Sequence, residues 1–198
     1  SASIHIRAEY CGPRQQIYIF KPLTMVLIWL IALLGQATAP FYKVMILAGL
    51  VCSTAGDVFL MLPSDRFVAG LVAFLIAHLF YSMAFVSEIH TLLWWPLVPL
   101  GAYGVVIYVI LFPSLGRLKS PVLLYVGAIL VMAWLAWERW GQTGQSGALL
   151  AFAGALLFVL SDTVLAVNRF RGRFKLARAL SLIAYFAAQC LIARSVGA

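Results

Sequence analysis

Charged residues are scarce in this chain of 198 residues, where they make up 10% of the sequence. A soluble globular domain carries about 25% charged residues, which cover the surface that faces water. Here 64% of the residues are hydrophobic on a count that includes alanine, tyrosine and cysteine. This composition excludes a soluble domain and a disordered chain. It also excludes a nucleic-acid binder, despite the formal net charge of +8, and it indicates a polytopic helical membrane protein.

Several kinds of functional site are missing from the sequence as well. The three cysteines form no CxxC pair, and the three histidines do not form a zinc-binding pattern. No H-E-x-x-H motif, glycine-rich phosphate loop or G-x-S-x-G elbow occurs. The last apolar stretch has no lysine, which excludes a retinal-type Schiff base there. We therefore expect neither a metal ion nor a cofactor.

Seven apolar stretches of roughly bilayer-crossing length follow one another along the chain. They are Leu23–Ala39, Phe41–Leu62, Phe67–Ser87, Leu92–Phe112, Val122–Trp137, Gly147–Val167 and Ala177–Val196. Prolines mark several of the boundaries, and tryptophans lie at the ends of two stretches, as interfacial aromatic residues do. The sequence thus predicts an all-α transmembrane bundle over residues 23–196, with a mixed N-terminal segment over residues 1–22.

Basic residues are distributed unevenly over the predicted loops. If the seven stretches alternate in direction, 11 of the 14 lysines and arginines fall on one side of the membrane. The densest basic segment follows the sixth stretch, between Asn168 and Arg178. By the positive-inside rule this side is cytoplasmic. We expect a protein of the bacterial inner (plasma) membrane with its basic loops in the cytoplasm.

Two aspartates lie inside apolar runs, Asp57 in CSTAGDVFLML and Asp162 in GALLFVLSDTVLAV. An ionised carboxylate in hydrocarbon costs at least ~2.5 kcal/mol, so such residues face the bundle interior or a wet cavity. Each lies five residues before the end of its stretch, which predicts a shared depth of ~7 Å. We expect both to open into one cavity. The alternative is two separate acids, each with its own partner. The other acidic residues fall in loops or at span ends: Glu9, Asp65, Glu88 and Glu138.

Other polar side chains gather in the same half of the predicted bundle. The candidate substrate-binding residues among them are Lys21, Tyr125, Asn168, Tyr185 and Gln189. His78 lies near the middle of the third stretch. An intramembrane histidine can be a hydrogen-bonded core residue, or it can transfer a proton or bind substrate. Both roles stay open for His78.

A series of short motifs resembles the YhhN-type lysoplasmalogenase family of membrane hydrolases. The motifs are KPLT (21–24), GDVFLML (56–62), FLIAHLFY (74–81), PVLLY (121–125), GALLFVLSD (154–162) and YFAAQCLIA (185–193). The resemblance covers the chain from His5 onward and implies an eight-helix membrane protein, whose first helix would be truncated here. It also implies hydrolysis of the vinyl-ether bond of lysoplasmalogens to a fatty aldehyde and a glycerophospho-base. Asp57 and Asp162 match the two aspartates thought to be catalytic in that family.

The chemistry implied by this resemblance agrees with the buried acids. Vinyl-ether hydrolysis requires proton transfer to the β-carbon, followed by capture of the oxocarbenium ion by water. Two aspartates in a low-dielectric pocket do not both ionise readily, so one retains its proton. The sequence thus supplies an acid and a base, and which aspartate is which stays open. We expect Lys21 to contact the phosphate of a lysophospholipid, and His78, Tyr125 and Tyr185 to orient water or glycerol.

A proton-coupled transporter or lipid carrier is the main alternative, because intramembrane aspartates also serve as proton relays. Helices that are broken within the membrane favour that class. Pro96, Pro99, Gly101 and Gly104, near one end of the fourth stretch, suggest such a break. A structural or receptor-like bundle would leave both buried aspartates unexplained.

The charge distribution leads to a test of orientation. In a variant without the native cysteines, Lys175→Cys should not react with a membrane-impermeant thiol reagent added to intact cells, because its loop is cytoplasmic. His90→Cys, on the opposite side of the predicted alternation, should react and serves as the control. Labelling of the first variant with protection of the second would reverse the orientation.

Overall fold

The computed structural model describes residues 14–36, 39–62, 64–172, 174 and 176–198. Over these residues the chain forms seven α-helices and no strand. They are α2 (Arg14–Leu34), α3 (Pro40–Met61), α4 (Phe67–Val86), α5 (Leu97–Leu111), α6 (Lys119–Thr143), α7 (Ser146–Phe170) and α8 (Ala177–Arg194). Two 3-10 turns, Phe112–Ser114 and Gly116–Leu118, join α5 to α6. The all-α membrane bundle predicted from the sequence is confirmed.

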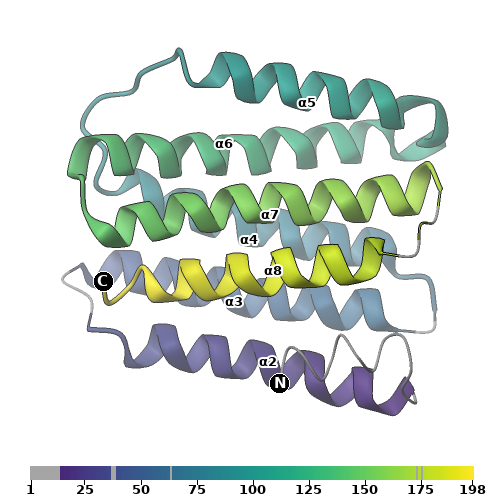
Figure 1. Ribbon diagram of the computed structural model, residues 1–198, viewed down its shortest axis with the longest axis horizontal. Helices are drawn as coiled ribbons and strands as arrows, with labels where there is room; N and C mark the ends of the chain where they lie inside the picture. The colour runs from purple at the N-terminus through teal and green to yellow at the C-terminus, as the bar shows by residue number, and fades with distance from the viewer. Residues whose placement is uncertain (1–13, 37–38, 63, 173, 175) are drawn as a thin grey trace.

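Six of these segments are long and apolar enough to cross a membrane, while the apolar part of α2, Lys21–Leu34, is shorter. The helices lie side by side along the long axis of the molecule, with α2 and α5 at opposite edges (Figure 1). α3 packs most closely against α4, and α7 against α8, while α4 and α7 both pack against α6. The helices that carry the two intramembrane aspartates, α3 and α7, are therefore connected through α4 and α6 on one side and through α8 on the other.

Small residues allow these helix pairs to approach closely. A Cβ atom at Gly49 of α3 would lie 2.3 Å from the Tyr81 ring of α4. A Cβ atom at Gly154 of α7 would lie 2.9 Å from the carbonyl oxygen of Ala188 in α8. Such distances are impossible for a real side chain, so glycine at both positions sets the spacing of the helices.

Several helix ends differ from those predicted. α2 begins at Arg14, within the N-terminal segment of residues 1–22 that was predicted to precede the bundle. Pro22 lies inside this helix. The expected truncated first helix lies outside the described residues. α5 begins at Leu97, and Pro96 is its N-cap. Pro99 occupies the first turn, where a proline does not interrupt hydrogen bonding. The predicted break in the fourth span is therefore wrong, because the prolines initiate a continuous helix.

α6 extends beyond its predicted end and carries two charged residues into the bundle. Glu138, predicted in a loop or at a span end, and the neighbouring Arg139 are 2% and 3% exposed. The Arg139 guanidinium donates to Glu88 Oε2 (2.9 Å) and to the Tyr42 hydroxyl (3.2 Å). The Tyr42 hydroxyl in turn lies 2.6 Å from Ser195 Oγ. This buried network joins α3 and the segments that follow α4 and α8 to α6.

The two arginine ion pairs differ in burial and should differ in their effect on stability. Arg139→Met leaves Glu88 without its partner in a largely buried position, so the free energy of unfolding should fall by about 3 kcal/mol. Arg169→Met breaks an exposed pair with Asp65, and the unfolding midpoint should hardly change. Reversible unfolding in mixed detergent micelles measures both. Equal destabilisation by the two variants would contradict the structural role of the Arg139 network.

Candidate functional site

Asp57 lies in the last turns of α3 and has buried partners from two other helices. Lys21 of α2 approaches Asp57 Oδ1 to 2.7 Å, and the Tyr185 hydroxyl of α8 donates to Asp57 Oδ2 at 2.7 Å. The carboxylate is 2% exposed. The preceding Gly56 has no side chain, which leaves room for the Phe74 ring of α4 over this turn. Asp57 therefore joins α2, α3 and α8 as the acceptor of an ion pair and a hydrogen bond.

A second layer of polar groups lies beside this ion pair. The Tyr81 hydroxyl donates to Gln189 Oε1 at 2.7 Å and lies 3.4 Å from Ser53 Oγ. All three residues have no exposed surface. Ser53 precedes Asp57 by four residues, so both lie on the same face of α3. The polar side of the Asp57 site thus continues toward the interior of the bundle.

Asp162 of α7 has a different environment. It accepts a hydrogen bond at Oδ2 from the hydroxyl of Tyr125, which comes from α6. Among the described residues no cation lies within ion-pair distance of Asp162. The preceding residue, Ser161, points toward α8, where its hydroxyl donates to the Ser181 carbonyl oxygen at 3.0 Å. The SD dipeptide therefore places its two side chains on different faces of α7.

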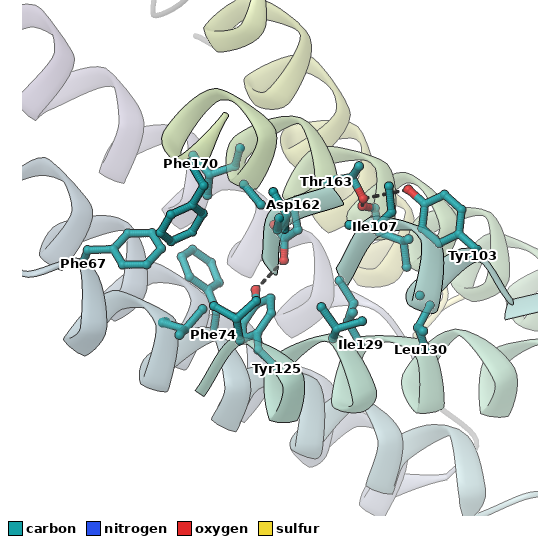
Figure 2. A pocket seen from close by; sticks show the side chains of 18 of the residues that line it. Phe67, Phe74, Tyr103, Ile107, Tyr125, Ile129, Leu130, Asp162, Thr163 and Phe170 are labelled. Atoms are coloured by element: carbon teal, nitrogen blue, oxygen red, sulfur yellow. Dashed lines mark hydrogen bonds between the residues drawn. The ribbon is translucent and has the colours of Figure 1, made fainter. Parts of the chain in front are cut away.

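Asp162 lines an apolar cavity of about 70 Å³ (Figure 2). The cavity is enclosed mainly by α4, α5, α6 and α7, and among its described lining residues the polar ones besides Asp162 are Tyr103, Tyr125 and Thr163. Figure 2 shows Asp162 between a pair of phenylalanines, Phe67 and Phe170, and the hydrogen-bonded pair Tyr103 and Thr163. The hydroxyl oxygens of the latter pair are 2.7 Å apart and connect α5 to α7. The cavity wall is thus mainly apolar and carries one carboxyl group.

Aromatic rings separate the two carboxyl groups. The Phe158 ring lies 5.5 Å from the Tyr185 ring and 4.8 Å from the His78 imidazole, measured between centroids. The His78 ring lies 5.2 Å from that of Tyr125. His78 has no exposed surface, and neither of its ring nitrogens has a hydrogen-bond partner among the described residues. Among the described residues the two aspartates share no hydrogen-bond partner, because Asp57 is bonded to Tyr185 and Asp162 to Tyr125.

The candidate residues therefore divide into two groups. Lys21 and Tyr185 contact Asp57, Gln189 belongs to the layer beside it, and Tyr125 contacts Asp162 with His78 packed behind it. Asn168 lies apart, because its Oδ1 accepts from the Phe174 backbone N–H at 3.3 Å in the connection to α8.

The expectation of one cavity shared by both aspartates requires correction. The cavity at Asp162 and Tyr125 is not lined by Asp57, Lys21 or Tyr185. The two aspartates also differ in position along their helices, because Asp57 lies four residues, about 6 Å, before the end of α3 and Asp162 lies eight residues, about 12 Å, before the end of α7. Because a helix can continue past the membrane surface, the predicted common depth stays a prediction.

Sequence reasoning missed Tyr103 and Thr163, which lie in the cavity wall. Thr163 directly follows Asp162, and this proximity was the available signal. Tyr103 belongs to a nearly uniform apolar run of α5, so its position in the wall could not be read from its surroundings. Phe158 was missed for the same reason, because an aromatic residue in an apolar helix carries no polar signal.

The fold and the site define a polytopic helical membrane protein with one charge-paired and one cavity-lining aspartate. The sequence profile of the YhhN family matches residues 16–196. The chain belongs to the YhhN family.

Relatives support this membership over nearly the whole chain. The membrane protein YhhN of Escherichia coli O6:H1, whose name describes it as uncharacterized, is 36% identical over 200 residues, which cover 99% of this chain and 94% of that protein. The human lysoplasmalogenase TMEM86A is 34% identical over 193 residues, covering 89% of this chain and 76% of the relative. Human lysoplasmalogenase TMEM86B is 35% identical over 162 residues, covering 78% and 64%. No solved structure matches the chain significantly.

The ion pair at Asp57 leads to a double-mutant test of stability. Lys21→Met should lower the free energy of unfolding by about 3 kcal/mol, because it leaves a buried carboxylate without its counter-ion. Adding Asp57→Asn should recover much of this loss, since the uncompensated charge is then gone. Unfolding of the two single variants and the double variant in mixed micelles measures the coupling. Additive losses in the double variant would contradict the pairing.

Proposed function

We propose that this protein is a lysoplasmalogenase that cleaves the vinyl-ether bond of a lysophospholipid to a fatty aldehyde and a glycerophospho-base. The observation that carries the proposal is a carboxyl group, Asp162, in the wall of an apolar cavity within the membrane-spanning bundle. A vinyl ether joins an alkyl chain to glycerol and needs an acid at that junction. The names of the TMEM86A and TMEM86B relatives support the same substrate class.

We infer different roles for the two aspartates from their different environments. Asp57 lies 2.7 Å from Lys21, and a buried carboxylate with a buried cation beside it stays ionised. Asp162 has a hydroxyl partner and apolar neighbours, and an apolar environment without a counter-ion favours the neutral carboxylic acid. Asp162 is therefore the proton donor, and Asp57 is the fixed negative charge.

The reaction begins with transfer of the Asp162 proton to the β-carbon of the vinyl ether. The electrons of the double bond form the new C–H bond, and the adjacent carbon becomes an oxocarbenium ion. Water adds to that carbon and gives one proton to the Asp162 carboxylate, which restores the acid. The resulting hemiacetal separates into aldehyde and glycerol hydroxyl, so one water is consumed per bond cleaved. Tyr125 holds the Asp162 carboxyl in place throughout.

Asp57 contributes through its charge rather than by contact with the substrate. A negative charge in a low-dielectric interior stabilises a cationic intermediate over a longer distance than it would in water. The aromatic cluster around Phe158 excludes water from the space between the two carboxyl groups and so preserves this effect. The two aspartates thus act on the same transition state from opposite sides of the cluster.

Substitution of each aspartate tests this division. Asp162→Asn should lower the rate of aldehyde release from a lysoplasmalogen by about 10²–10⁴-fold, because an amide cannot donate the proton. Asp57→Asn should lower the rate less, because it removes a charge but leaves the proton donor. Ser161→Ala is the matched control, since this side chain is adjacent in sequence but faces α8, and it should keep most of the activity.

The readout is free aldehyde released by purified protein in lipid nanodiscs, with unfolding midpoints measured for every variant. Wild-type protein that releases no aldehyde would refute the proposed activity. A folded Asp162→Asn variant that keeps its rate within about threefold of wild type, far short of a general-acid effect, would refute the role of Asp162.

A further inference from the structure

The phosphate of the proposed substrate needs a cationic partner, and Lys21 is already committed to Asp57 at 2.7 Å. In phospholipid recognition the strongest partners for phosphate are guanidinium groups, which donate several hydrogen bonds in a plane. A phosphate partner must also lie within one glycerol unit of the reacting vinyl ether. The phosphate partner should therefore be an arginine at the end of the bundle nearest Asp162.

A separate pocket of about 400 Å³ lies at that end of the bundle. It is lined by the first turn of α4 with the residues before it, by the end of α7 and by one residue before α6: Asp65, Arg66, Phe67, Val68, Ala69, Leu118 and Arg169. We call it the rim pocket. It contains two guanidinium groups and one carboxylate, so its net charge favours an anion. Its volume is within the range of small-ligand sites.

The rim pocket adjoins the cavity that contains Asp162. Phe67 lines both spaces, and its ring contacts the ring of Phe170 at 5.6 Å. The Arg169 guanidinium lies over the Phe67 ring at 5.0 Å. A ligand with a phosphate in the rim pocket would therefore have its next atoms beside the phenylalanine pair that ends the apolar cavity.

The spacing along α7 agrees with one ligand occupying both spaces. Arg169 follows Asp162 by seven residues, which is about 10 Å of rise and places both on the same side of the helix. Side chains on a helix lean toward its N-terminus, so Arg169 extends back toward Asp162. The separation between guanidinium and carboxyl is then compatible with the glycerol unit that joins phosphate to vinyl ether.

We propose that Arg66 and Arg169 form the phosphate-binding subsite for a single-chain glycerophospholipid whose ether bond lies at Asp162. This subsite rests on the proposed function for the identity of the ligand. At present the Asp65 carboxylate accepts a hydrogen bond from Arg169 Nη2 at 2.5 Å. Asp65 thus holds the place of the ligand anion and must release Arg169 when the phosphate binds.

The electrostatics of Asp65 support this arrangement. The hydrogen bond from Arg169 holds the pKa of Asp65 below its usual range, so the carboxylate is ionised and competes for the guanidinium at neutral pH. Both side chains are exposed at the rim, where an ion pair contributes little and can exchange partners. A lipid phosphate, which presents more acceptor oxygens than a carboxylate, can displace it.

The experiment compares two substrates that differ only in the phosphate headgroup: a lysoplasmalogen and the corresponding 1-alkenylglycerol. In the Arg66→Gln/Arg169→Gln variant, kcat/KM for the lysoplasmalogen should fall roughly tenfold through KM, while kcat/KM for the alkenylglycerol stays unchanged. Asp65→Asn should act in the opposite direction and lower KM for the lysoplasmalogen alone. Arg171→Gln is the matched control, because this exposed arginine is two residues further along and does not line the rim pocket, and it should change neither substrate.

A binding measurement separates failure of this subsite from failure of the proposed reaction. A non-hydrolysable alkyl-ether lysophospholipid should bind wild-type protein in nanodiscs more tightly than the double variant, even if no aldehyde is released from any substrate. Equal losses for both substrates, or equal binding by wild type and double variant, would overturn the subsite. Displacement of the lipid by inorganic phosphate at equal concentration would also overturn it, because the pocket would then be a general anion site.

Discussion

The membrane interior imposes one constraint from which the site follows: a buried charge needs a partner of opposite charge. Asp57 meets this constraint through Lys21, and the pair ties the N-terminal helix α2 to α3 and α8. Among the residues that the structure describes, the Tyr125 hydroxyl is the sole hydrogen-bond partner of Asp162, which favours the neutral form of this carboxyl group. Two residues of one type therefore acquire different chemistry from the helices around them. The aromatic cluster at Phe158 lies between the two environments.

The small volume of the cavity at Asp162 limits which part of the proposed substrate it can hold. A cavity volume of about 70 Å³ corresponds to only about five waters, which is far too small for a whole lipid. The cavity can hold the reacting bond and its immediate neighbours, so the headgroup and the rest of the chain must lie outside it. In the proposed binding mode the rim pocket holds the headgroup. The hydrocarbon chain of the proposed substrate meets the weakest barrier to entering the cavity at α5, because this helix packs mainly against α6 and only slightly against α7.

The sequence predicts the bundle well because long apolar runs with few charges have one stable solution in a bilayer. The prediction is wrong where an apolar segment does not form a helix. Residues 92–96 are apolar but form a connection, held by the Trp134 indole N–H donating to the Leu93 carbonyl oxygen at 2.9 Å. Asp57 and Asp162 are identifiable because charge in hydrocarbon is rare. Their partners are not, since the contacts of Lys21 with Asp57 and of Tyr103 with Thr163 join helices far apart in the chain. The E. coli and human relatives agree with the family expected from the motifs.

The central claim is that Asp57 is ionised and Asp162 protonated in the resting protein. Infrared spectroscopy detects a protonated carboxyl group through its C=O stretching band and separates it from a carboxylate. At neutral pH the wild-type protein should show such a band, which Asp162→Asn removes and Asp57→Asn retains. Loss of the band in Asp57→Asn with retention in Asp162→Asn would contradict the account, because the proton would then reside on the aspartate beside Lys21.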